Sequence, residues 1–275
     1  MAKITAADVN KLRKMTGAGM MDCKNALVEA EGDFDKAVEI LRKKGQKVAA
    51  KRADRESSEG VVVATLNDER TRGVLISLNC ETDFVAKNED FIKLAEQFGK
   101  IALNYNTKDE FLNAPFDDKI SVTEKVTEQT GVIGEKIEIG AFEALEGAYL
   151  GSYIHSNKKI GTLVAFNKKS GGIEEVAHDI AMQVAAMSPI ALDENSVPKE
   201  IIDKELEIAK EQLRNEGKPE NMLDKIAQGK LKKFFKESTL VNQAFIKDNK
   251  KSVADYVKEH DPELQITGFK RVALG

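Results

Sequence analysis

The feature that most constrains the fold of this chain is a weak internal repeat. Each copy contains a strand, a polar turn, a second strand and an amphipathic helix; the first copy begins at Gly60 and the second at Gly147. A helix that follows such a hairpin buries its apolar side against the hairpin. Segments 136–144 and 265–274 are predicted to add a third strand to each copy. The sequence therefore predicts an α+β fold with two similar core subdomains, each an antiparallel sheet covered by a helix.

The N-terminal 45 residues predict a bundle of three short helices. Apolar side chains recur three and four positions apart in each of them. The first helix is expected between an N-cap at Thr5 and a stop at Gly17, and the third between an N-cap at Asp33 and a stop at Gly45. Met20 and Met21 are adjacent in the second helix, so we expect one of them to be exposed.

Residues 42–55 form a strongly basic segment. It contains a single acid, Asp54, and the basic residues Arg42, Lys43, Lys44, Lys47, Lys51, Arg52 and Arg55. The net charge of the whole chain is −4, so this basic front end contrasts with an acidic body. Two interpretations stay open: a solvated linker, or a contact with RNA or with an acidic protein face. Ser57, Ser58 and Gly60 then mark a domain boundary.

Residues 198–236 interrupt the strand pattern and predict an antiparallel helical hairpin. Pro198 opens its first helix, and Gly217, Lys218 and Pro219 make the turn. The expected apolar stripe consists of Ile202, Leu206, Ala209 and Leu213 on the first helix and Leu223, Ala227, Leu231 and Phe234 on the second.

These observations divide the chain into three parts. Residues 1–55 form the helical bundle with the basic linker, residues 56–146 the first core subdomain, and residues 147–275 the second. The helical hairpin 198–236 is an insertion in the second subdomain.

Composition restricts the class of protein. The chain has 275 residues, of which 41% are hydrophobic, enough for a sizeable core. It contains no apolar stretch of about 18 residues and opens without a signal-peptide segment. We therefore expect a soluble cytoplasmic protein that is not inserted in a membrane.

The residues do not form a pattern typical of catalysis. Cys23 and Cys80 are far apart and each has apolar neighbours, so we expect buried free thiols. The histidines, His155, His178 and His260, do not pair at helical spacing, which disfavours a zinc site. Neither a phosphate-binding loop nor a nucleophile elbow is present. We expect a protein that is not an enzyme, holds no metal or cofactor and does not itself bind nucleotide.

The decapeptide Asn79–Asn88, of sequence NCETDFVAKN, places apolar residues where a polar turn is expected. It connects a buried strand to a helix that has Asn88 as its predicted N-cap. That helix already has a complete apolar face without Phe84. Phe84 is not placed as a hydrophobic staple, because the position before the N-cap is the charged Lys87. Two interpretations remain: Phe84 is buried locally by another route, or a partner protein buries it.

This decapeptide, together with residues 16–24 (TGAGMMDCK), resembles the family of bacterial elongation factor Ts. Further matching stretches are Leu150–Tyr153 with His155, His178–Met182 and Thr267–Phe269. They occur in order and span nearly the whole chain. The resemblance implies a guanine-nucleotide exchange factor for elongation factor Tu, the translational GTPase, with an N-terminal bundle of ubiquitin-associated-like (UBA-like) fold.

The resemblance also implies a set of partner-binding residues. Asp83 and Phe84, flanked by Thr82 and Val85, are expected to enter a crevice of the GTPase, disturb its magnesium and phosphate site and so release GDP. The remaining contacts implied by the resemblance are Arg13, Met20, Met21 and Lys24 in the bundle, and Ile133 and His155 in the core.

Other implications concern assembly. In this family the hairpin is associated with dimer formation or partner contact, so a homodimer is possible. Many members continue past the Thr-Gly-Phe strand into a further helix that touches the GTPase, whereas this sequence stops at Gly275; we expect a correspondingly weaker contact.

Two alternative functions stay open. The first alternative is an RNA- or ribosome-associated protein that binds through segment 42–55. This segment lacks the interleaved aromatic residues of such sites, so nucleic acid is an unlikely partner. The second alternative is a UBA-like adaptor, a function that would require the N-terminal bundle but not the Phe84 loop.

Overall fold

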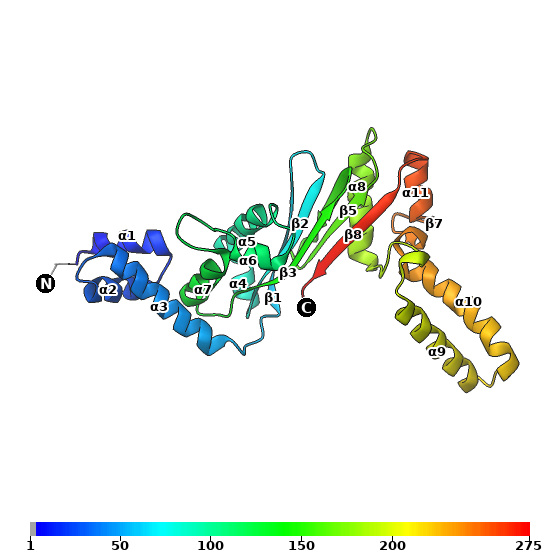
Figure 1. Cartoon of the computed structure of the whole chain (residues 1–275), viewed down its shortest axis with the longest axis horizontal. Coiled ribbons are helices and arrows are strands. Elements are labelled where there is room, and N and C mark those ends of the chain that lie inside the picture. Colours follow the sequence, from blue (N-terminus) through cyan, green and yellow to red (C-terminus); the bar gives the residue numbers. More distant parts are fainter. Residues whose placement is uncertain (1–3) are drawn as a thin grey trace. The chain divides into compact units, whose positions relative to one another are not determined.

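The computed structural model describes residues 4–275, so the first three residues of the predicted bundle lie outside it. The helices are α1 (Ala6–Thr16), α2 (Met20–Glu29), α3 (Phe34–Arg52), α4 (Asp83–Ala86), α5 (Glu89–Ala102), α6 (Lys108–Asn113), α7 (Val122–Ile133), α8 (Ile173–Met187), α9 (Lys199–Asn215), α10 (Glu220–Ser238) and α11 (Val253–His260). The strands are β1 (Glu59–Leu66), β2 (Arg72–Cys80), β3 (Glu138–Glu146), β4 (Tyr149–Ile154), β5 (Ile160–Phe166), β6 (Ala244–Phe245), β7 (Asp248–Ser252) and β8 (Ile266–Ala273). Figure 1 shows their course along the chain.

The strands confirm the predicted α+β class. One three-stranded sheet has the order β1-β2-β3, a second has the order β4-β5-β8, and β6 pairs with β7. In both three-stranded sheets the third strand is the one predicted from the sequence. The described residues form two compact units: residues 4–65, Ile76–Glu143 and Val272–Gly275 make the first, and Leu66–Leu75 and Ala144–Arg271 make the second. The sequence-based domain boundaries at residues 55 and 146 stay a prediction.

The N-terminal bundle of α1, α2 and α3 forms where the helix signals predicted it. Thr5 caps α1 in a reciprocal capping box with Asp8, and Gly17 ends α1 in the left-handed conformation. Asp33 caps α3 through the amide of Lys36. The bundle buries a small core of Val9, Leu12, Ala18, Cys23, Ala26, Leu27, Ala30 and Ala37.

The prediction that α3 ends at Gly45 is wrong: the helix continues to Arg52. Gly45 is buried within it and packs against Gly131 of α7. A Cβ built on Gly131 would lie 2.4 Å from the Gly45 Cα, so the two backbones are in direct contact. Gly45 therefore serves close helix packing and does not end the helix. Helix α7, which was not predicted from the sequence, supplies the opposite side of this contact.

Residues 42–52 of the basic segment belong to helix α3, and Lys43, Lys44, Lys47 and Lys51 on it are exposed. The role of residues 42–55 as a linker stays a prediction. Several cations of this segment form ion pairs within the chain. Lys43 pairs with Glu39 at 2.8 Å, Lys44 with Asp22 at 2.5 Å and Arg52 with Glu81 at 2.7 Å.

In the second unit, α8 packs on the β4-β5-β8 sheet. Strands β4 and β5 are antiparallel, with Tyr149 opposite Phe166. Tyr149, Phe166 and Ile266 from the sheet form one core with the apolar face of α8, which includes Ile173 and Ile180. This arrangement confirms the predicted second copy of the repeat.

The hairpin of α9 and α10 confirms the predicted helical insertion (Figure 1). Pro198 and Pro219 are the N-cap residues of the two helices, and Gly217 in the turn has a φ of 75°. Ala209 and Leu213 of α9 form a buried cluster with Leu223 and Ala227 of α10.

We predict that Gly131→Ala destabilises the first unit. The added methyl must displace the α3 backbone, and overpacking of this kind typically lowers the free energy of unfolding by about 1–3 kcal/mol. Calorimetric unfolding of the full chain measures the change as a lower midpoint temperature.

Gly229→Ala is the matched control. Gly229 lies inside α10, and a Cβ there meets nothing within 4 Å. Alanine favours a helix over glycine by about 0.8–1 kcal/mol, so this variant should be slightly more stable. A Gly131→Ala chain as stable as this control would show that α3 and α7 separate easily.

Candidate functional site

Phe84 is the most exposed large apolar side chain recorded among residues 4–275. It lies in α4, a single helical turn between the end of β2 and the start of α5, and 83% of its surface is accessible. Of the two interpretations of Phe84, local burial is wrong. The molecule holds an aromatic ring in solvent, which is unfavourable unless another surface covers it.

Helix caps define the path of the chain around Phe84. Thr82 is the N-cap of α4, and its hydroxyl oxygen accepts from the Val85 amide at 3.5 Å. Asn88 is the predicted N-cap of α5, and its Oδ1 accepts from the amides of Asp90 at 2.8 Å and Phe91 at 3.3 Å. Two caps six residues apart fix both ends of α4, so the ring projects from a defined turn.

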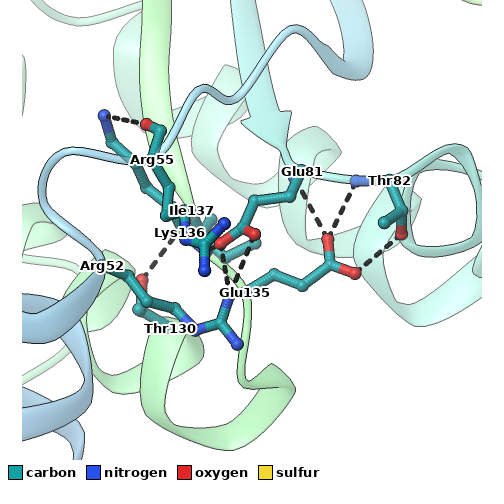
Figure 2. A network of polar contacts seen from close by, with 8 residues as sticks. All are labelled: Arg52, Arg55, Glu81, Thr82, Thr130, Glu135, Lys136 and Ile137. Carbon is teal, nitrogen blue, oxygen red and sulfur yellow. Dashed lines mark hydrogen bonds and ion pairs between the residues drawn. The ribbon is translucent and has the colours of Figure 1, made fainter.

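Glu135 fixes the chain immediately before α4. Its Oε2 accepts from the amides of Glu81 at 3.1 Å and Thr82 at 3.0 Å, and its Oε1 accepts from the Thr82 hydroxyl at 2.7 Å (Figure 2). Glu135 follows Gly134, which ends α7 in the left-handed conformation with a φ of 80°. One carboxylate thus binds three donors from two consecutive residues.

The Glu81 side chain makes a second connection at the same place. Its Oε1 and Oε2 accept from Nη1 of Arg52 at 2.7 and 2.9 Å, and its Oε1 also accepts from the Lys136 amide at 2.6 Å (Figure 2). The amide of Lys136, and then Arg52, lower the pKa of Glu81 below its usual 4.5, against the opposing effect of burial. The end of α3 is therefore joined to the residue that precedes Thr82.

Cys80 lies under this network as a buried thiol. Burial first, and the charge of Glu135 second, raise its pKa to about 12. Its Sγ donates to the Thr82 carbonyl at 3.2 Å. Cys23 and Cys80 are both buried and free, as predicted. Cys80 is protonated at neutral pH and has no nucleophilic character.

A groove borders the exposed ring. Phe84 and Val85 line it together with Ile133 of α7, and the other lining residues are Gly17, Asn88, Asp90, Phe91, Gln129 and Val132. The structure therefore brings three of the predicted partner-binding residues to one groove. Asp83, beside the ring, pairs with Lys87 at 2.5 Å one helical turn later.

The predicted contact residues of the bundle all face solvent. Arg13 and Lys24 are exposed, and Met20 and Met21 are 55% and 63% accessible. At least one of the two methionines was expected to be exposed, and both are, because both lie at the start of α2, before its buried stripe begins at Cys23. Flexible, polarisable methionine side chains suit adaptable protein contacts.

His155 belongs to the second unit, at the end of the β4 strand. It is exposed, and its Nδ1 is 3.0 Å from the Tyr153 hydroxyl. The Tyr153 ring also meets the His178 ring edge-on, with 5.6 Å between centroids. His178 is exposed and Met182 is half-buried.

Three further residues near the site carry no signal of their own in the sequence: Glu135, which binds the chain before α4, and Gln129 and Val132, which line the groove. They belong to the segment around α7, for which no element was predicted. A signal was present: Ser121 and Glu124 form a capping box at the start of α7.

Among residues 4–275, no group of three or more His, Cys, Asp or Glu side chains is placed to hold a metal ion. In the same part of the chain, the helices are all too short or too polar to cross a membrane.

Comparison with known proteins shows the family to which the chain belongs. A family model described as "Elongation factor TS" matches residues 81–275. A protein named Elongation factor Ts from Christiangramia forsetii is 68% identical over 275 residues, which cover all of both chains. Its counterpart from Flavobacterium psychrophilum is 62% identical over 275 residues, again all of both chains. The one from Porphyromonas gingivalis is 48% identical over 274 residues, 98% of each chain.

The class of this protein is therefore that of the translation elongation factors, and the prediction that it is not an enzyme is confirmed. Within that class, the chain belongs to the elongation factor Ts family.

We predict that Arg52→Met raises the pKa of Glu81 toward 4.5 without reaching it, because the bond from the Lys136 amide, the larger cause of the lowering, remains. A carboxyl with a lowered pKa stabilises the fold above its unfolded pKa and loses that effect as pH falls through its folded pKa. The stability difference between wild type and variant should therefore vanish at acidic pH. A carbon-13 NMR titration of the Glu81 carboxyl measures the shift.

Lys43→Met is the control for this experiment. Lys43 lies on the same helix but pairs with Glu39 on the exposed side, so the titration of Glu81 should not change. An identical Glu81 pKa in wild type and Arg52→Met would contradict a role for Arg52 at this carboxylate.

Proposed function

We propose that this protein binds elongation factor Tu in its GDP-bound form and promotes GDP release, which allows GTP to load. In this proposal Asp83 and Phe84 enter the partner near its magnesium and phosphate site. The family of the chain supports the general activity, and the exposed Phe84 ring is the observation that carries the mechanism.

The exposed ring supplies the driving force for insertion. Burying a phenylalanine side chain is favourable by about 1.5–3 kcal/mol relative to leaving it in water. In the free protein that gain is unused, because Phe84 lies in solvent. A partner that provides a pocket for the ring gains it, and a rigid ring in the pocket displaces whatever partner segment was there.

Asp83 adds an electrostatic effect. A carboxylate brought near the phosphates repels them and competes with them for the magnesium ion. Its neighbour Lys87, 2.5 Å away in the free protein, keeps the charge partly neutralised until the site is engaged.

Exchange requires only competition between binding equilibria. If the factor weakens the affinity of the partner for GDP, GDP weakens the affinity of the partner for the factor by the same ratio. Cycling is then possible: the factor expels GDP, and incoming GTP expels the factor. This scheme uses neither a nucleophile nor a general base on this chain.

We further propose that residues around Phe84, which acts as a wedge in this mechanism, orient the complex with the partner. Thr82, Val85 and Ile133 lie beside the ring, and the bundle presents Arg13, Met20, Met21 and Lys24 to the same partner. His155 provides a contact from the second unit. Exposed methionines and cations on short helices supply adaptable apolar area and charge.

We predict that Phe84→Ala reduces the maximal rate of GDP release by about 100-fold, as loss of a well-packed aromatic anchor does. Folding should be nearly unaffected, because the ring is 83% exposed. Stopped-flow release of a fluorescent GDP analogue from purified elongation factor Tu, with rising concentrations of factor, measures the rate.

Ile246→Ala serves as the matched control. Ile246 is also an exposed apolar residue, 37% accessible, but lies in the second unit next to β6, and its truncation should leave the release rate unchanged. Equal rates for wild type and Phe84→Ala would overturn the wedge mechanism. No acceleration by the wild-type chain would overturn the exchange function itself.

A further inference from the structure

An exposed ring acts as a wedge only if the backbone beneath it resists the insertion. Helix α4 has four residues, and isolated helices of that length are unstable in water because nucleation is unfavourable. Few backbone hydrogen bonds hold this turn: the amide of Ala86 donates to the Thr82 carbonyl at 3.2 Å, that of Lys87 to Asp83 at 3.0 Å and that of Asn88 to Val85 at 3.0 Å. The conformation of α4 must therefore be held from outside.

The external support comes from Glu135. Its carboxylate binds the Glu81 amide, the Thr82 amide and the Thr82 hydroxyl, at 3.1, 3.0 and 2.7 Å. Hydrogen bonds to a charged acceptor are about twice as strong as those between neutral groups. Thr82 lies two residues before Phe84 and is also the N-cap of α4. These bonds therefore fix the start of α4, and with it the backbone that carries the Phe84 ring.

Glu135 itself is rigidly mounted. It follows the C-terminal turn of α7, whose Gly131 touches Gly45 of α3. The next residue, Lys136, donates its amide to Glu81 at 2.6 Å, and Ile137 donates its amide to the buried Thr130 hydroxyl at 3.2 Å. Before Glu135, the Gly134 amide donates to the Thr130 carbonyl at 2.9 Å. Backbone bonds on both sides of Glu135 thus leave its side chain little freedom to follow a moving α4.

We propose that Glu135 is a positioning residue for nucleotide exchange: its carboxylate anchors the N-terminus of α4 and so fixes the direction in which Phe84 is presented to the partner. This inference rests on the proposed function and assigns a role to a residue outside the groove that meets the partner. Glu135 acts through Thr82 and does not itself touch the nucleotide.

The proposal predicts a specific division of the kinetic effect. The exposed surface that recognises the partner is intact in Glu135→Ala, so the concentration of factor that gives half-maximal release should change little. The maximal release rate should fall by about tenfold, because small misplacements of an acting group are costly. Glu135→Gln keeps an oxygen that accepts from the two amides and should lie between wild type and Glu135→Ala.

The matched control is Glu110→Ala. Glu110 also accepts from two consecutive amides at a helix N-terminus, those of Asn106 at 3.0 Å and Thr107 at 3.1 Å. It caps α6 in the same unit and is absent from the Phe84 groove. We expect Glu110→Ala to lose about as much thermal stability as Glu135→Ala but to keep the wild-type rate of GDP release. That result would show that the effect of Glu135→Ala on exchange does not come from general destabilisation.

A double variant tests whether Glu135 acts through the ring. Once Phe84 is alanine, its direction no longer matters, so Phe84→Ala with Glu135→Ala should release GDP at the rate of Phe84→Ala alone. Additive losses would overturn the proposal. So would an unchanged maximal rate in Glu135→Ala.

Amide hydrogen exchange of the full-length protein without its partner gives an independent result. Exchange of the Thr82 and Val85 amides should be faster in Glu135→Ala than in wild type and unchanged in Glu110→Ala. Unchanged protection at these amides would overturn the proposal even if wild type fails to accelerate GDP release, so failure of the positioning role and failure of the proposed function are distinguishable.

Discussion

An apolar ring stays in water at a fixed place only if the backbone beneath it is held by something other than the ring. In most of a folded protein the side chain anchors its own backbone by being buried. Phe84 is exposed and cannot anchor its own backbone in this way. Polar contacts hold that backbone instead: the helix caps at Thr82 and Asn88, and the carboxylate of Glu135. The rest of the first unit can be understood as support for this arrangement.

The support reaches back to the N-terminal bundle. Helix α3 carries Arg52, which holds Glu81, and α3 touches α7, which is followed by Glu135. The Glu135 carboxylate binds the amide of Glu81, 54 positions earlier in the chain. The Glu81 carboxylate in turn binds Arg52 and the amide of Lys136, the residue after Glu135. Charge-assisted bonds of short length tolerate little displacement, so helix packing far from Phe84 contributes to its placement.

Local signals in the sequence predicted much of this structure. Thr5, Asp33 and Asn88 cap helices as expected, because a short polar side chain before an apolar periodic segment has few other local uses. The repeat of hairpin and helix predicted both sheets, including their third strands.

The errors arose where a residue serves a tertiary contact. Gly45 resembles a helix stop, but its missing side chain makes room for Gly131, which lies 86 positions away in the chain. The sequence also does not indicate that Glu135 binds the loop before α4, since one carboxylate among 46 acidic residues carries no local mark. The hydrophobicity of the loop singled out Phe84, but the sequence alone left open whether the chain itself or a partner buries the ring. The residues that hold the backbone beside Phe84 could be found only from the fold.

The same exposed ring presents a hazard before any partner arrives, because solvent-exposed aromatic groups promote self-association. The surrounding sequence limits it: Asp83 and Lys87 lie within the same turn, and Glu89 and Asp90 follow directly. Charges that flank an apolar residue act as gatekeepers against aggregation. Under the proposed mechanism, the charged residues around Phe84 limit self-association of the free protein while its ring stays accessible to the partner.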